Sequence, residues 1–141
     1  MRASVRWAAV VCCVVGAWTQ LGCLDELADR AGIERVARGC DIRTSQLEAR
    51  PYCQEWRGLL KSPSSDVTPR AVCNTLGADF LEGPCPSQGI IAGCYIGELG
   101  DGSKSYHWYY PSEEKNIMTA DDVKRACEGG GDTFVMWTAP E

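Results

Sequence analysis

The residues of this chain that could do chemistry together lie close to its single histidine. Ser103, Ser105 and Asp101 come shortly before His107, and a serine hydrolase needs a hydroxyl, a histidine base and a carboxylate within reach of one another. In an extended strand Ser105 and His107 point to the same side, but the sequence has no Gly-x-Ser-x-Gly turn that would expose a nucleophile. A small secreted hydrolase is therefore the alternative hypothesis, and His107 is expected to be structural.

Other patterns do not favour catalysis. The cysteines lack the Cys-x-x-Cys spacing of zinc sites. Glu113-Glu114 is expected in a solvated loop, and Asp121-Asp122 at a helix N-terminus. The run Gly129-Gly130-Gly131 follows the expected helix instead of preceding it, so it does not form a phosphate cradle. We predict no catalytic residue, no metal and no cofactor.

An aromatic strand is the best candidate for a binding surface. Tyr106, Trp108 and Tyr110 share one face of it, and His107 and Tyr109 share the other. If one set faces solvent, its rings could stack on a glycan or contact a partner protein. The competing interpretation is that Tyr106, Trp108 and Tyr110 are simply the core of the domain.

The N-terminus predicts export. Arg2 and Arg6 precede an apolar run that ends at Ala17, which suits a signal peptide better than a membrane span of roughly 20 residues. The sequence Leu21-Gly22-Cys23 resembles the signal of bacterial lipoproteins. The resemblance implies that residues 1–22 are removed and that Cys23 is lipidated, which would anchor the protein to a membrane. The alternative is ordinary cleavage after Ala17, giving a periplasmic or extracellular protein.

The cysteine count agrees with lipidation. Of the nine cysteines, two leave with the signal and Cys23 would carry lipid. An even number remains, which can pair fully in an oxidising compartment: Cys40, Cys53, Cys73, Cys85, Cys94 and Cys127. Sequence alone cannot choose among the pairings. The expected packing of helix on hairpin favours Cys94 with Cys127. The echo between residues 73–80 and 127–134 then favours Cys73 with Cys85, and Cys40 with Cys53 would close a helical hairpin.

The net charge of the chain restricts the kind of partner that it is expected to bind. The net charge is −5, and acidic side chains outnumber basic ones in residues 62–141. An acidic domain does not suit nucleic acid, whose binding depends on Lys and Arg contacts to phosphate. The partners expected are a membrane, reached through the lipid anchor, and an unidentified protein or glycan.

The first half of the mature chain is predicted to be helical. Residues 24–39 have apolar side chains at helical spacing, and a second segment opens at Pro51 with Tyr52, Trp56 and Leu59 on one helical face. These segments predict a short helical hairpin in a region that spans residues 23–61. Residues 62–65 are rich in Ser and Pro and are interpreted as a linker.

Residues 66–141 predict a disulfide-stapled α+β domain with an antiparallel sheet and packed helices. From Cys94 to Trp137 we expect a strand, a turn at Gly100–Gly102, a strand, a helix capped by Thr119, and a closing strand. Residues 73–80 and 127–134 share the pattern Cys, three residues, Gly, two residues, Phe. This echo predicts that one supersecondary unit is used twice around one sheet.

The C-terminal half also resembles small cysteine-containing modules of secreted proteins and lipoproteins of bacteria. The matching residues are Cys85-Pro86, Gly93-Cys94, Tyr109-Tyr110, Ala126-Cys127 and Gly130-Gly131. The resemblance implies no activity. The sequence therefore predicts an exported, non-enzymatic lipoprotein of the cell envelope, anchored at the outer membrane, with a binding or structural role.

Overall fold

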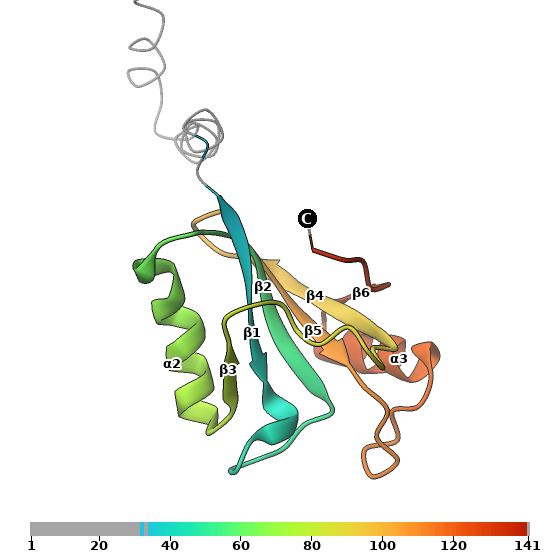
Figure 1. Cartoon of the computed structure of the whole chain (residues 1–141). Helices are drawn as coiled ribbons and strands as arrows, with labels where there is room; N and C mark the ends of the chain where they lie inside the picture. Colours follow the sequence, from blue (N-terminus) through green and yellow to red (C-terminus); the bar gives the residue numbers. More distant parts are fainter. Residues whose placement is uncertain (1–31, 33, 141) are drawn as a thin grey trace, which may run out of the picture. The chain divides into compact units, whose positions relative to one another are not determined.

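A computed structural model describes Gly32 and residues 34–140 (Figure 1). The predicted signal peptide of residues 1–22, the predicted lipid attachment site Cys23 and the predicted helical residues 24–31 lie outside the described residues. The predictions made for them stay predictions.

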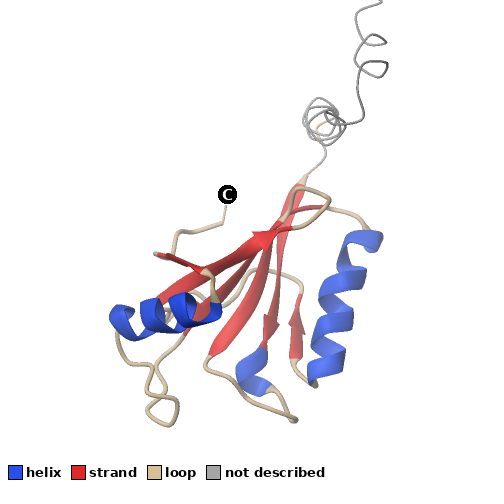
Figure 2. Cartoon of the chain, turned by 180° about the vertical axis from the view of Figure 1, so that it is seen from behind, coloured by secondary structure: helices blue, strands red, loops and turns tan. Residues whose placement is uncertain are grey.

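The described chain contains one six-stranded sheet in the order β3-β1-β2-β5-β4-β6, in which every pair of neighbours is antiparallel. Two helices pack on it, which confirms the α+β class (Figure 2). In chain order the elements are β1 Arg35–Asp41, η2 Ile42–Thr44, β2 Tyr52–Leu60, η3 Pro63–Asp66, α2 Val67–Leu76, β3 Asp79–Leu81, β4 Ala92–Glu98, β5 Lys104–Tyr109, α3 Ala120–Gly130 and β6 Thr133–Val135.

The sheet is built from one ββαβ unit used twice, as the sequence echo predicts. Residues 35–81 form the first repeat and residues 92–135 the second, and in each the closing strand pairs with the first strand of its own hairpin. Equivalent residues recur at one constant offset along the chain: Gly39 and Gly93, Cys40 and Cys94, Cys73 and Cys127, Gly77 and Gly131, Phe80 and Phe134. Strands β2 and β5 join the two repeats through the pair Gln54 and His107, which marks the approximate twofold axis.

Each repeat carries the same disulfide. Cys40 bonds to Cys73, joining β1 to α2, and Cys94 bonds to Cys127, joining β4 to α3; both bridges span a sequence separation of 33. The third bridge, Cys53–Cys85, ties β2 to the connection between the repeats and has no counterpart in the second repeat. The prediction for Cys94–Cys127 is confirmed. The predictions of Cys40–Cys53 and Cys73–Cys85 are wrong, because each repeat staples its own helix to its own sheet.

Both helices cover the same face of the sheet. Residues directly opposite each other in antiparallel strands point to one side, and Cys40, Gln54, His107 and Cys94 form one such row across four strands. Since Cys40 bonds to α2 and Cys94 bonds to α3, the two helices lie on that side. Each helix encloses a small apolar cluster, centred on Trp56 in the first repeat and on Val123 in the second.

The helix boundaries follow local signals in the second repeat better than in the first. Thr119 caps α3 through a capping box with Asp122, as predicted, and Gly131 in the left-handed region ends the helix. Helix α2 begins at Val67 after an Asp66 N-cap. The side chain of Asp66, the N-cap residue, makes no capping hydrogen bond, so the sequence does not clearly mark where α2 begins.

The predicted helical hairpin is wrong where the structure describes it. Residues 35–41 and 52–60 are strands β1 and β2. Along β2, Tyr52 and Trp56 point to the helix side by simple alternation, and a bulge at Gly58, with φ of 79°, returns Leu59 to the same apolar cluster. This combination of alternation and bulge produces the spacing of an amphipathic helix.

The predicted linker at residues 62–65 does not separate two domains. Strands β1 and β2 precede it and are hydrogen-bonded into the same sheet as β4 and β5. Pro63–Asp66 forms the short helix η3, which leads directly into α2. The Ser and Pro composition marks a tight connection within one domain, which begins at Glu34.

Gly93 should tolerate no side chain. A Cβ there would lie 2.4 Å from Cε3 of Trp108 and 2.8 Å from the carbonyl oxygen of His107. We expect Gly93→Ala to lower the free energy of unfolding by about 3 kcal/mol, measured by urea denaturation. Gly129→Ala is the matched control, because a Cβ added at Gly129 would meet nothing within 4 Å and alanine favours a helix by up to about 1 kcal/mol. Equal stability of the two variants would contradict the close approach.

Candidate functional site

The predicted binding face of Tyr106, Trp108 and Tyr110 is not an open surface. Trp108 is 1% exposed and Tyr110 is 4% exposed, and both belong to a core cluster on the side of the sheet away from the helices. Tyr106 is half-buried and stacks on Trp108 with ring centroids 5.2 Å apart. The competing interpretation, that these rings are core, is the correct one.

Two segments cover these rings. The connection of residues 82–91 crosses the sheet after β3, and Cys85 fixes it to β2 through the bridge to Cys53 (Figure 1). The Tyr110 hydroxyl donates to the carbonyl oxygen of Pro86 in this connection. Trp137, in the segment that follows β6, packs against the same cluster. The sheet is thus covered on both faces, which sequence patterning alone did not reveal.

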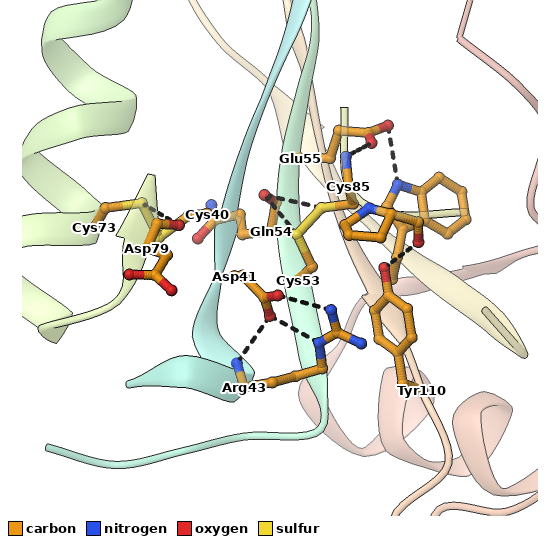
Figure 3. Close-up of a disulfide and its surroundings, with 12 residues drawn as sticks. Cys40, Asp41, Arg43, Cys53, Gln54, Glu55, Cys73, Asp79, Cys85 and Tyr110 are labelled. Atoms are coloured by element: carbon orange, nitrogen blue, oxygen red, sulfur yellow. Dashed lines mark hydrogen bonds and ion pairs between the residues drawn. A yellow bond between two sulfur atoms is a disulfide. The ribbon is translucent and has the colours of Figure 1, made fainter. Parts of the chain in front are cut away.

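A buried carboxylate organises this covered face (Figure 3). Glu55 is 0% exposed, and it accepts hydrogen bonds from the indole Nε1 of Trp108 at 3.1 Å and from the backbone nitrogen of Cys85 at 2.6 Å. Arg57, two residues along the same strand, completes the set by an ion pair with Glu55. The guanidinium of Arg57 lies over the rings of Tyr106 and Trp108. Every partner of Glu55 is structural, and they fix the covering segment to the sheet.

The opposite face has a more open centre, which we call the central strip. It consists of Tyr52, Gln54, His107 and Tyr109, all partly exposed, on the two strands that lie between the helix-bearing strands β1 and β4. Tyr52 stacks on His107 with centroids 4.2 Å apart and an interplanar angle of 15°, and contacts Tyr109 at 5.3 Å. Partly exposed rings of this kind suit stacking on a ligand.

His107 is held neutral in this strip. Burial lowers the pKa of His107 from 6.5 to about 4, and the positive charge of Arg50 acts in the same direction. The flat contact with Tyr52 fixes the ring. The imidazole is therefore a structural part of the strip, consistent with what the sequence predicts for an isolated histidine.

The serines of the hydrolase hypothesis have other partners. The Ser103 hydroxyl is fully buried and donates to Asp101 at 2.6 Å. The Ser105 hydroxyl accepts from the Gln54 side-chain amide at 3.2 Å. Within residues 34–140 no hydrogen bond joins either serine to His107, so the structure does not bring these residues together as a nucleophile and its base.

A shallow cavity of about 200 Å³, which we call the basic pocket, opens at the end of the sheet where β2 begins and β5 ends. Arg43, Arg50 and Lys115 line it, together with Tyr110, Ser112 and Glu114. The guanidinium of Arg43 stacks 3.6 Å from the ring centroid of Tyr110 and is bound through Nε and Nη2 by Asp41 (Figure 3). Sequence reasoning missed this pocket, because its residues come from segments far apart in the chain.

Glu55 was also missed, and nothing in the sequence marks it. An acid between Gln54 and Trp56 resembles an ordinary surface residue. In contrast, the cysteine count identified the disulfide cysteines correctly. The six cysteines that follow Cys23 in the sequence form the three bridges. Disulfides of this number indicate an oxidising, exported environment.

No family model, curated protein or solved structure matches this chain. Among the described residues, no group of three or more His, Cys, Asp or Glu side chains is placed to hold a metal ion. No helix in the described part of the chain is long and apolar enough to cross a bilayer. The functional argument therefore rests on the two faces of the sheet and the basic pocket.

Folding stability should fall as the pH is lowered from about 6.5 toward 4. In this window the unfolded chain protonates His107 whereas the folded ring stays neutral, so the contribution of His107 is fully present above pH 6.5 and is lost as the pH approaches about 4. The loss should reach about 3 kcal/mol, measured by urea unfolding at several pH values. Asp122, whose pKa is lowered to about 2, acts only at lower pH.

The variant His107→Gln isolates this effect. Glutamine keeps a polar planar group but cannot titrate, so the pH dependence between about 6.5 and 4 should flatten. An unchanged pH dependence in His107→Gln would show that other groups cause it.

Proposed function

We propose that this protein is an exported envelope protein that is lipidated at Cys23 and serves as a non-enzymatic binding module. Three observations support the proposal: the lipoprotein-like sequence ending at Cys23, the three disulfides, and the partly exposed rings on the helix-bearing face of the sheet. A lipid at Cys23 would hold the folded domain at a membrane surface by acyl-chain burial.

The central strip is the surface that we assign to binding. It carries the proposal because its three rings, Tyr52, His107 and Tyr109, are partly exposed and contact one another. Its rings are preordered by stacking, so little conformational entropy is lost when a ligand packs on them. A glycan or a protein side chain fits a strip of this chemistry.

Lipidation at Cys23 can be tested directly. Cells fed a labelled fatty acid should label the wild-type protein and leave Cys23→Ser unlabelled. Equal labelling of both proteins, or a mature N-terminus at Trp18, would contradict the anchor.

Binding by the central strip can be tested with the unlipidated Cys23→Ser protein, which separates binding from anchoring. This protein should cosediment with isolated cell envelopes. Adding Gln54→Lys places a charge in the strip, directly opposite His107 on the neighbouring strand, and desolvating that charge should weaken binding by about tenfold or more.

Asn74→Lys is the matched control, because it adds the same charge at an exposed position of α2. Thermal unfolding verifies that both variants fold. Equal cosedimentation of the two variants would show that the central strip is not the binding surface.

A further inference from the structure

The two repeats differ most in two loops. The connection between β1 and β2, residues 42–51, is longer than its counterpart at residues 99–103. The connection between β5 and α3, residues 110–119, is longer than its counterpart at residues 61–66. A segment that breaks an internal repeat is not needed to build the repeated fold, so these loops are the places to look for a specific role.

The two long loops meet at one end of the sheet. Tyr52 begins β2 opposite Tyr109 at the end of β5, so the loops that adjoin these residues leave the sheet side by side. The backbone nitrogen of Tyr110 donates to the carbonyl oxygen of Pro51 at 2.9 Å and ties one loop to the other. The lining of the basic pocket comes entirely from these two loops. The pocket therefore exists only because both insertions are present.

The pocket brings three cationic side chains together on a chain whose net charge is −5. Its charged lining residues are Arg43, Arg50, Lys115 and the single acid Glu114. Each cation also has a carboxylate neighbour: Asp41 for Arg43, Glu48 for Arg50 and Glu114 for Lys115. These carboxylates balance the formal charge of the three cations, so the pocket offers hydrogen-bond donors rather than a net positive charge. They also hold the long side chains in place.

Arg43 and Arg50 keep N–H groups that these ion pairs do not use. A guanidinium has five N–H groups in a fixed fork. Asp41 is bound through Nε and Nη2 of Arg43, so Nη1 and the second hydrogen of Nη2 are left. Arg50 gives Nη2 to Glu48 and Nη1 to the Tyr52 hydroxyl at 3.5 Å, which leaves further hydrogens on both nitrogens. The Ser112 hydroxyl adds a neutral group on the same wall.

We propose that the basic pocket binds a phosphoryl group, carried by a small soluble phosphate ester or by a phospholipid headgroup. This deepens the proposed binding role, on which it rests, by naming a ligand chemistry for a site beside the central strip. A tetrahedral dianion accepts hydrogen bonds from several directions, which suits three cations from two loops. A single carboxylate would satisfy only one guanidinium fork.

The size of the pocket agrees with a small group. A volume of about 200 Å³ is below the several hundred Å³ of typical pockets for drug-sized ligands. Tyr110 forms part of the floor beneath Arg43, and its hydroxyl is bound to Pro86. Arg43 is thus fixed from below by an aromatic ring and from one side by Asp41, so it is preorganised for an anion.

The test measures binding of inorganic phosphate, sulfate and acetate to the full mature chain carrying Cys23→Ser, by calorimetry at low salt. Phosphate and sulfate should bind, and acetate should bind at least about tenfold more weakly, because it has one charge and a planar carboxylate. The variant Arg50→Gln/Lys115→Gln should weaken phosphate binding by about tenfold or more. Arg43 is left intact because it pairs with the buried Asp41.

Arg70→Gln/Lys124→Gln is the matched control. Arg70 and Arg50 have side chains that are 47% and 50% exposed, and Lys124 and Lys115 are 55% and 47% exposed. Each of the four has a carboxylate neighbour, so the two double variants remove equal charge from similar surroundings. The control should bind phosphate as the parent does. Equal weakening in both variants would overturn the site, since it would show only nonspecific attraction.

A second arm separates the two sources of the phosphoryl group. Vesicles of zwitterionic lipid with added phosphatidic acid should retain the protein, dependent on Arg50 and Lys115, if the source is a headgroup. Phosphate binding without vesicle retention assigns the pocket to soluble phosphate esters. No measurable phosphate or vesicle binding would overturn the inference. That negative result would leave the proposed function intact if binding to cell envelopes still depended on the central strip.

Discussion

The buried carboxylate of Glu55 is the constraint on which the covered face of the sheet depends. A charge taken fully out of water is costly unless it is paired and hydrogen-bonded, and Glu55 is 0% exposed. Its partners come from three places: Trp108 on β5, Cys85 in the connection between the repeats, and Arg57 on its own strand. One side chain therefore fixes the central strands, the connection and a stacked pair of rings together. The unique bridge Cys53–Cys85 adds a covalent link at the same position.

The duplicated architecture explains why the two halves form one domain. After each repeat, the trailing segment reaches the central strand region of the other repeat. Pro86, which follows the first repeat, accepts from Tyr110, and Thr138, which follows the second, accepts from Arg57. The equivalent glycines Gly39 and Gly93 make room for side chains of the sheet beneath this layer, because a Cβ at either position would lie within 3 Å of Leu81 or Trp108. Two helices on one face and two covering segments on the other then enclose a sheet that either repeat alone would leave half open.

The functional proposal depends on the difference between the two faces of the sheet. The covered face is occupied by structural contacts, whereas the helix-bearing face keeps stacked, partly exposed rings next to the strand pair Gln54 and His107, where the approximate twofold axis crosses the sheet. The basic pocket lies at one end of that row, since Arg50 contacts the hydroxyl of Tyr52 in the central strip. The bridges Cys40–Cys73 and Cys94–Cys127 secure the helices that flank the strip.

The sequence by itself determined the features that depend on neighbouring residues: the capping box of Thr119 and Asp122, the turn before β5, the glycine that ends α3, and the echo that marks the repeat. It also predicted Cys94–Cys127, because the two cysteines lie within one hairpin-and-helix unit. Only the tertiary structure decided that residues 52–60 form a strand. The bulge at Gly58 gives the apolar residues of this strand the same sequence spacing as the apolar face of a helix. The partners of Cys40 and Cys53, the burial of Trp108 and Tyr110, and the position of Glu55 were likewise decided by contacts across the sheet. The physical reason is that alternation along a strand tells which residues share a face, whereas the segment that covers that face comes from elsewhere in the chain.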